Sequence, residues 1–333
     1  MPDLSIIIVS WNAWELLDQC LHSIYQQLRA VHFEILYVDN ASEDNSVEQV
    51  QARYPFVKVF CNDQNLGFAK ANNIALRAFS GRYALLLNND TILLPGAIET
   101  LIAYMDENPQ VGACGPLLVY ADETPQVSYG YFPSLWTAAM ASPLDRLFPP
   151  PLGNHRLGIV PRLDENPHSV DYIRGACLFV RREVVEQVGL MDERFFLYCE
   201  ETDWCYRIRQ KGWEIHYVPT SRIVHIGSQG LIRTPFRMHY ELYHSLRKFV
   251  RKYHPGWYVT LLGLVLVTAL TANSLAFFLL GLFRKDYTTS RAKAQDLALQ
   301  ASVVVKVWLN QTENEIIKPE GSGAKQDIIA GEN

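Results

Sequence analysis

The sequence lacks the cysteine pattern of a disulfide framework or a zinc site. Its six cysteines are scattered over 333 residues, and no two of them form a C-x-x-C pair. This pattern is typical of thiols that stay reduced in a cytosol. The N-terminus also lacks a secretory signal, because its first apolar run, residues 6–9, is too short. We therefore expect a cytoplasmic domain without disulfides.

The sequence also lacks a glycine-rich phosphate loop. Neither G-x-G-x-x-G nor G-x-x-x-x-G-K-[ST] occurs, which argues against the common dinucleotide and P-loop sites. The net charge is −5 and no long basic run interleaves with aromatic residues, so nucleic acid is not an expected partner. If the chain binds a diphosphate, a divalent cation held by Asp and His is the expected source of positive charge.

What the sequence does contain, in its first 90 residues, is a regular alternation of strand-like and helix-like segments. The predicted segments are, in order, strand 4–9, helix 14–28, strand 33–38, a helix around Val47 and Val50, strand 57–60, helix 68–78 and strand 83–87. Short β-branched runs that alternate with helical spacing are typical of βαβ units. The sequence therefore predicts an α/β fold with a doubly wound, mostly parallel sheet.

Polar residues follow each of the four predicted strands. They are Ser10 and Asn12, then Asp39 and Asn40, then Asn65 with Gly67, and finally Asn88, Asn89 and Asp90. One such cluster is an ordinary helix cap or turn. Four of them at the same edge of an open α/β sheet indicate a ligand site, because ligands bind at the carboxyl ends of the strands.

Two later segments carry groups suited to catalysis or to metal binding. Glu200, Glu201 and Asp203 fall within four residues, beside several aromatic residues. In the first turn of a helix their charge is stabilised by the helix dipole, and composition alone favours this interpretation. On the functional interpretation, a desolvated carboxylate serves as a general base. His225 ends an apolar run, where a histidine is more often structural than a metal ligand.

Residues 258–283 carry no charge and form the most apolar segment of the chain. As a helix this segment is about 39 Å long, enough to cross a hydrocarbon core of ~30 Å. A single span and a monotopic attachment both fit, and a buried helix is the alternative. The preceding residues alternate an apolar face with Arg247, Lys248, Arg251 and Lys252, as in a helix that lies on an anionic surface. These upstream cations favour a cytoplasmic N-terminal domain.

Seven stretches together resemble glycosyltransferase family 2, the inverting transferases of the GT-A fold, and within it the rhamnosyltransferase-like branch of bacterial polysaccharide biosynthesis. In the family's order, the stretches are SIIIVSWN (5–12), VDNASEDNS (38–46), NLGFAKANN (65–73), LLLNNDTIL (85–93), RGACLFVRR (174–182), VGLMDERFFLYCEETDWCYRIRQKG (188–212) and IVHIGSQG (223–230). Each stretch is weak by itself, whereas the ordered set is specific. It covers about residues 4–235.

The resemblance implies a set of nucleotide-sugar-binding residues. The residues that would line the nucleoside pocket are Ser10, Asn12, Asp39 and Asn40, and those that would close over the donor are Asn65, Gly67 and Asn72. Gly67 would allow close approach of the backbone.

The resemblance also implies a metal site and a base. Asp90 ends a turn that resembles the family's Asp-x-Asp motif, in which Asn88 replaces the first Asp, and His225 resembles a further ligand of Mg²⁺ or Mn²⁺. Glu201 stands where the family has its catalytic Asp, with Glu200 and Asp203 as alternates.

The implied function is the inverting transfer of a sugar, rhamnose or a related hexose, from a donor such as dTDP-rhamnose to a lipid-linked or glycan acceptor at the cytoplasmic face of the inner membrane. The alternatives are a non-catalytic nucleotide-sugar-binding scaffold of a polysaccharide assembly and a soluble nucleotidyltransferase.

We expect three parts of the chain. Residues 1–235 form the GT-A catalytic domain, in which 121–170 is a loop insertion. Residues 236–311 hold the basic amphipathic helix, the membrane segment and a following helix, and residues 312–333 are a disordered tail.

Overall fold

The computed structural model describes residues 2–140, 166–227, 235–282 and 287–310. The helices are α1 (Trp14–Gln27), α2 (Ser46–Arg53), α3 (Gly67–Leu76), α4 (Ala97–Glu107), α5 (Leu135–Met140), α6 (Arg182–Val188), α7 (Glu200–Gln210), α8 (Pro235–Tyr253), α9 (Gly256–Leu282) and α10 (Tyr287–Trp308). The strands are β1 (Leu4–Ser10), β2 (Phe33–Asp39), β3 (Lys58–Cys61), β4 (Tyr83–Asn88), β5 (Thr91–Leu93), β6 (Val111–Val119), β7 (Tyr129–Gly130), β8 (His168–Ser169), β9 (Tyr172–Ile173), β10 (Cys177–Arg181) and β11 (Glu214–His225).

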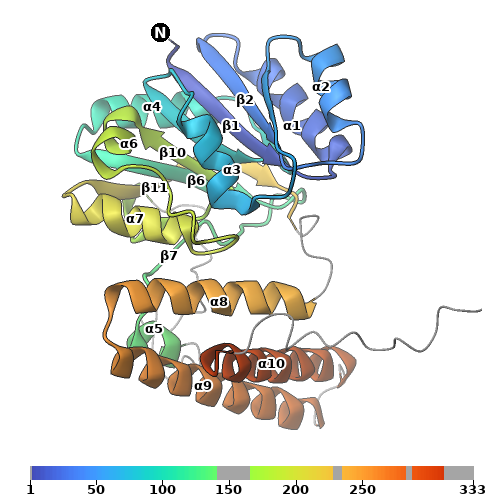
Figure 1. Cartoon of the computed structure of the whole chain (residues 1–333), viewed down its shortest axis with the longest axis vertical. Coiled ribbons are helices and arrows are strands. Elements are labelled where there is room, and N and C mark those ends of the chain that lie inside the picture. Colours follow the sequence, from blue (N-terminus) through green and yellow to red (C-terminus); the bar gives the residue numbers. More distant parts are fainter. Residues whose placement is uncertain (1, 141–165, 228–234, 283–286, 311–333) are drawn as a thin grey trace, which may run out of the picture.

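One mixed sheet forms the centre of the molecule (Figure 1). Its strand order is β3-β2-β1-β4-β10-β6-β11-β5, and β8 pairs with β11. The first four strands are mutually parallel, as the alternation of strands and helices predicts. β10 then runs antiparallel to both of its neighbours, while β6 and β11 are again parallel to each other. The predicted doubly wound, mostly parallel α/β sheet is confirmed.

Helices cover both faces of the sheet, which explains why the strands read as continuous apolar runs. α1, α2 and α4 pack on one face, for example through Leu21, Val50 and Leu101. α3, α6 and α7 pack on the other face, for example through Ala71 and Trp204. The carboxyl ends of the first four strands are left at one edge, where the polar residues of the predicted site stand.

The last three helices form a separate layer with its own apolar core. α8 lies between the sheet domain and the pair α9 and α10, and α5 from the insertion after β6 packs against α9 (Figure 1). Fully buried side chains of this layer include Tyr243, Phe249 and Val250 of α8, Leu262 of α9 and Val304 of α10. The predicted tail at 312–333, and residues 141–165 of the insertion, lie outside the described residues.

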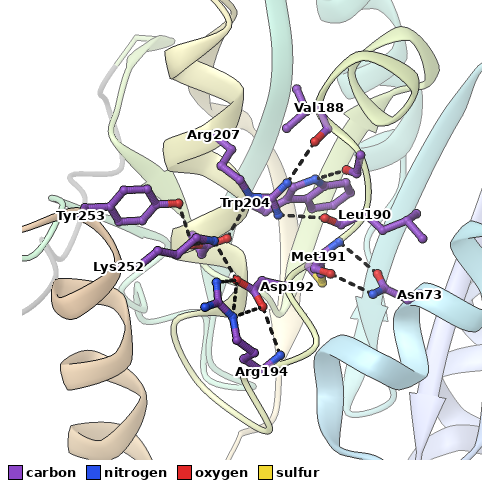
Figure 2. Close-up of polar contacts among 12 residues, drawn as sticks. Asn73, Val188, Leu190, Met191, Asp192, Arg194, Trp204, Arg207, Lys252 and Tyr253 are labelled. Atoms are coloured by element: carbon purple, nitrogen blue, oxygen red, sulfur yellow. Dashed lines mark hydrogen bonds and ion pairs between the residues drawn. The ribbon is translucent and has the colours of Figure 1, made fainter.

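α8 has the predicted amphipathic pattern, but its apolar face is not free for a membrane. Leu246, Phe249 and Val250 are buried against protein. On the basic side, Lys252 forms ion pairs with Asp192 at 2.7 Å and with Asp203 at 2.6 Å (Figure 2). The expectation that this helix lies on a surface by its apolar face is therefore wrong, because that face is buried against protein, with Phe249 in contact with Phe132 and with Tyr206 of α7.

Candidate active site

The carboxyl ends of three parallel strands meet at one edge of the sheet. In the pairing of β1 with β2, Ser10 lies opposite Asp39. In the pairing of β1 with β4, Val9 lies opposite Asn88. The strand register therefore brings together the polar residues that end β1, β2 and β4, at the edge where open α/β sheets bind their ligands.

Two loops at this edge are fastened to each other. The N–H of Asn12 donates to Ser42 Oγ at 2.9 Å, and the N–H of Glu43 donates to Asn12 Oδ1 at 2.6 Å. Asn12 has a φ of 49°, a left-handed conformation that asparagine tolerates better than most residues. Asp39 Oδ2 also accepts from the N–H of Ser42, at 2.9 Å. Asn12 and Asp39 thereby shape the rim of the edge, and their contact with a donor stays a prediction.

Asn40 is buried, and both its amide oxygen and its amide nitrogen form hydrogen bonds within the protein. Its Oδ1 accepts from the side chain of Asn62 at 3.0 Å and from the N–H of Leu66 at 3.1 Å. Its Nδ2 donates to Asn65 Oδ1 at 3.1 Å and to the carbonyl of Gly67 at 3.2 Å. These contacts favour a role for Asn40 in positioning the loop before α3.

The start of α3 is packed tightly against the loop that precedes α7. The N–H of Phe68 donates to the carbonyl of Phe196 at 2.7 Å. Gly67 has a φ of +77°, and a Cβ there would lie 2.3 Å from that same carbonyl oxygen, so only glycine fits. Asn72 is buried and donates to the carbonyl of Phe68 at 2.9 Å. Gly67 thus lets the start of α3 pack against this loop, whereas the hydrogen bond of Asn72 stays within α3.

The turn after β4 is held by backbone and side-chain contacts. The carbonyl of Asn88 accepts from Thr91 Oγ1 at 2.7 Å, and its N–H donates to the carbonyl of Ala176 at 3.0 Å. Its side chain makes no hydrogen bond within the described residues. Asn89, one of the polar residues predicted at this strand end, donates to Ser10 Oγ at 2.7 Å. The turn is therefore linked directly to the end of β1.

Asp90 and His225 face each other across this turn. Asp90 Oδ1 lies 3.4 Å from His225 Nε2, and it is a buried oxygen without a hydrogen-bond partner among the described residues. The backbone joins the two segments, because the N–H of Ile226 donates to the carbonyl of Asp90 at 2.9 Å. The structure thus brings together the two residues that the sequence predicts as metal ligands.

Gln126 sets the orientation of the His225 ring. Its Oε1 lies 2.8 Å from His225 Nδ1, and its Nε2 donates to the His225 carbonyl. An amide oxygen only accepts, so Nδ1 carries the proton, and in the neutral ring Nε2 presents its lone pair toward Asp90. Sequence analysis missed Gln126, since one glutamine in a loop insertion carries no signal of a catalytic role.

Two lone-pair atoms that face each other fit a bound cation. A buried carboxylate oxygen without a partner is costly, and a divalent ion between it and an imidazole nitrogen would offset that cost. No group of three or more His, Cys, Asp or Glu suited to a metal occurs in the described part of the chain. Asp90 and His225 alone leave most of the coordination shell to a ligand or to water, as is usual for Mg²⁺.

Glu200 and Glu201 open α7 on the other side of the edge. Glu200 is buried and its Oε2 has no hydrogen-bond partner among the described residues. Burial and the neighbouring charge of Glu201 raise the pKa of Glu200 well above its ordinary value. Burial also raises the pKa of Glu201, although the positive charge of Arg174 opposes this shift. Glu201 is partly exposed, which makes it the more accessible base of the two.

Asp203 is fully buried and its carboxylate is saturated. It accepts from Arg207 Nε at 2.9 Å, from Lys252 Nζ at 2.6 Å and from Tyr253 OH at 2.8 Å (Figure 2). A base must be free to take a proton from a substrate. The geometry therefore favours a structural role for Asp203, which joins α7 to α8, and weakens it as an alternate base.

The sequence relationships agree with this architecture. The family model described as Glycosyl transferase family 2 matches residues 5–189. The N-acetylglucosaminyl-diphospho-decaprenol L-rhamnosyltransferase of Mycobacterium tuberculosis is 30% identical over 238 residues, which are 67% of this chain and 76% of that protein. Rhamnosyltransferase WbbL of Escherichia coli is 26% identical over 258 residues, 74% of this chain and 92% of that protein.

A similar fold occurs in a solved structure of low sequence identity. The mannosyltransferase PcManGT from Pyrobaculum calidifontis, solved in complex with GDP-Man and Mn²⁺, superposes with a TM-score of 0.59. The match covers 93% of this chain and 88% of that one at 17% sequence identity. It supports the fold of the chain as a whole, including its C-terminal helices.

Proposed function

Because the chain belongs to glycosyl transferase family 2, we propose that it transfers rhamnose or a related hexose from a nucleoside-diphosphate donor to a lipid-linked or glycan acceptor in cell-surface polysaccharide biosynthesis. The donor we propose is dTDP-rhamnose or a close analogue, since two of the relatives are named as rhamnosyltransferases. The observation that carries the proposal is the pair Asp90 and His225, at the strand edge that Glu201 also borders.

The proposed binding of the donor divides between two groups of residues. Ser10, Asn12 and Asp39 stand at the ends of β1 and β2 and are proposed to contact the nucleoside. Asn40, Asn65, Gly67 and Asn72 build the adjoining loop and the start of α3. Asn88, whose side chain makes no hydrogen bond within the described residues, is proposed to contact the diphosphate.

Asp90 and His225 are proposed to hold Mg²⁺ or Mn²⁺, together with oxygen atoms of the donor diphosphate. Their facing acceptor atoms fit such an ion. When bound, the cation would neutralise charge on the departing nucleoside diphosphate. Gln126 keeps the ring of His225 turned toward Asp90, as partners of metal-binding histidines commonly do.

Glu201 is proposed to take the proton of the acceptor hydroxyl as that oxygen attacks the anomeric carbon. Its raised pKa makes it a stronger base than an ordinary glutamate. Gly175 leaves room beside it, because even a Cβ at that position would lie 3.9 Å from the Cβ of Glu201. One direct displacement inverts the configuration of the sugar.

The test is the release of nucleoside diphosphate by the purified full chain from a panel of nucleotide sugars, with and without EDTA. We expect EDTA to abolish release, and Glu201→Gln to lower turnover by about 10²–10⁴-fold while donor binding persists. Glu107→Gln, an exposed glutamate of α4, is the matched control. Release that EDTA leaves unchanged would contradict the metal role of Asp90.

The alternatives give different results in the same assay. A non-catalytic scaffold binds the donor without releasing diphosphate in any variant, and a nucleotidyltransferase releases pyrophosphate. The stereochemistry is tested by NMR of the product, since retention of the donor's anomeric configuration contradicts a direct displacement.

We further propose that the enzyme is attached to the cytoplasmic face of the cell membrane. Gly256–Leu279 within α9 has a mean hydropathy of 2.0 and is long and apolar enough to cross a bilayer by length and composition. Attachment would bring the site to a lipid-linked acceptor.

A further inference from the structure

α9 exposes one continuous face along its length. The exposed large apolar side chains are Trp257, Leu261, Leu264, Leu275, Phe278 and Leu279, here called the α9 stripe. These positions, with exposed Thr268 and Thr271 between them, recur at steps of three and four and so share one side of the helix. The opposite side, including Val259, Leu262 and Leu266, is buried against protein. A helix that crosses a bilayer alone is surrounded by lipid instead.

α10 runs parallel to α8 and joins it by hydrogen bonds. His239 Nε2 lies 2.8 Å from Asp296 Oδ1, and Tyr243 OH donates to Gln300 Oε1 at 2.7 Å. The residue numbers of the bonded pairs increase together along both helices, so the helix axes are parallel. The two helices therefore lie side by side.

α10 also runs antiparallel to α9. Ser274 Oγ donates to the carbonyl of Ala294 at 2.8 Å, and Trp308 Nε1 donates to the carbonyl of Val259 at 2.7 Å. Here the numbers rise along one helix as they fall along the other. All three axes are thus aligned, and the middle of α9 lies at the level of the N-terminal half of α8 (Figure 1).

The other side of α8 is fastened to the catalytic domain. Ser245 Oγ donates to the carbonyl of Leu197 at 2.8 Å, and Lys248 Nζ donates to the carbonyl of Arg194 at 2.8 Å. If α9 stood along the membrane normal, these contacts and the charges around them would lie at the depth of the hydrocarbon core. Each charge there costs several kcal/mol. The arrangement excludes an upright α9.

A basic pocket lies between the last turns of α8 and residues 194–195 of the loop before α7. Its volume is about 450 Å³, and it is lined by Arg194, Phe195, Lys248, Arg251 and Lys252. Asp192 pairs with two of these cations, Arg194 and Lys252. Within the part of the chain that the structure describes, no carboxylate pairs with Lys248 or Arg251. Surplus positive charge therefore stands in the last turns of α8, close in the chain to Trp257 at the start of the stripe.

We propose that the α8–α10 layer attaches the enzyme monotopically to an anionic phospholipid bilayer, with the α9 stripe in the acyl layer parallel to the membrane and the basic pocket on a lipid phosphate. This inference rests on the proposed membrane attachment and replaces a span by an in-plane anchor. Amphipathic helices with aromatic and leucine side chains on one face and cations nearby bind interfaces in this way.

The first test measures binding of the purified full chain to vesicles of phosphatidylcholine with and without phosphatidylglycerol. We expect Leu264→Glu with Leu275→Glu to weaken binding to both vesicles by about 100-fold or more. Lys248→Ala with Arg251→Ala should weaken binding about 30-fold, and only to the anionic vesicles.

Two controls match these variants. Phe56→Glu replaces an exposed apolar residue of the catalytic domain, and Arg29→Ala with Lys211→Ala removes exposed cations far from the pocket in the chain. Both controls should bind as the unaltered chain does. Equal losses of vesicle binding in control and test variants would overturn the proposal. So would stripe variants that bind vesicles unchanged but convert a dimer of the chain into a monomer, because the stripe would then be a dimer interface.

The second test locates the two ends of α9. Cys61 is exposed and is replaced by serine, while the other cysteines are buried. A single cysteine is then placed at Gln51 of α2 or at Gln295 of α10, both exposed. In the monotopic arrangement, an impermeant maleimide labels both positions from the side to which the protein was added. Protection of position 295 alone contradicts it.

Failure of this inference is distinguishable from failure of the proposed function. Diphosphate release from a soluble donor needs no vesicle, so stripe and pocket variants should retain it. If neither the unaltered chain nor any variant releases diphosphate, the proposed function is contradicted. The vesicle-binding result still tests the attachment in that case.

Discussion

Gln126 shows how a side chain without acid–base chemistry of its own can prepare a site. It contacts His225 through both its oxygen and its nitrogen, and so fixes the ring and the tautomer together. The Nε2 lone pair of His225 is thereby held toward Asp90 before any ligand binds. Preorganisation of this kind lowers the cost of binding, because the ring does not have to be ordered afterwards.

Replacement of Gln126 should therefore weaken metal binding more than it lowers turnover. We expect Gln126→Ala to raise the Mn²⁺ concentration for half-maximal diphosphate release by about 10–100-fold, with a smaller effect on turnover at saturating Mn²⁺. Direct Mn²⁺ binding in the presence of nucleoside diphosphate gives a readout besides activity. Gln110→Ala, at an exposed position in a turn, is the control. Equal metal dependence of both variants would show that Gln126 does not position His225.

Glu200 predicts a pH dependence of stability. Burial and the charge of Glu201 raise its pKa well above 4.5, so the folded protein holds this proton more tightly than the unfolded chain. The corresponding stability is complete below pH 4.5 and is lost as the pH rises through the folded pKa. We expect the Tm of Glu200→Gln, relative to the unaltered chain, to improve steadily between pH 4.5 and 8. A pH-independent difference would contradict the raised pKa.

At the scale of elements, α7 connects the candidate active site to the α8–α10 layer. Its first residues, Glu200 and Glu201, border the strand edge, while Asp203 of the same turn accepts from Lys252 and Tyr253 of α8 (Figure 2). The three acids in the first turn of α7 are stabilised by the helix dipole, so the structural interpretation of this cluster also holds. The same turn carries the proposed base, Glu201, and the packing contacts of Asp203 with α8.

The contact between α7 and α8 should depend on Lys252. We expect Lys252→Ala to lower the free energy of unfolding by about 1.5–3 kcal/mol, because it removes a charged hydrogen-bond donor from a carboxylate that stays buried. Arg251→Ala, one residue earlier and without a carboxylate partner among the described residues, should change it by less than about 0.5 kcal/mol. Chemical denaturation of both variants measures the difference. Equal effects would mean that the Asp203 pair contributes no stability.

At the scale of the whole molecule, the described residues form two layers with different surfaces. The sheet domain carries its polar groups at one strand edge, and the helical layer carries the α9 stripe. α8 belongs to both, since Phe249 and Lys252 contact α7 of the catalytic domain while His239 and Tyr243 bond to α10 of the helical layer. Monotopic attachment would hold the site at a fixed height above the bilayer, where a lipid-linked acceptor presents its sugar.

The sequence by itself determined the first four strands, the order of the first helices and the polar character of the strand ends. These are local properties: runs of β-branched residues, helical spacing and turn residues occur within ten or so positions. The α/β class follows from their alternation, and the family from the ordered motifs. Residue type alone made Asp90, His225 and Glu201 candidates among other polar residues, and the resemblance to the family assigned the first two to one metal site and Glu201 to the base.

Only the tertiary structure decided which of those candidates meet and what their neighbours do. Gln126 and His225 are 99 residues apart, and Asp203 and Lys252 are 49 apart. No local pattern encodes such pairs, because they depend on how strands and helices are packed. The same holds for α8 and α9: periodicity identified the apolar face of α8 and the uncharged length identified α9, but only packing showed that α8 buries its face in protein while α9 leaves one face exposed.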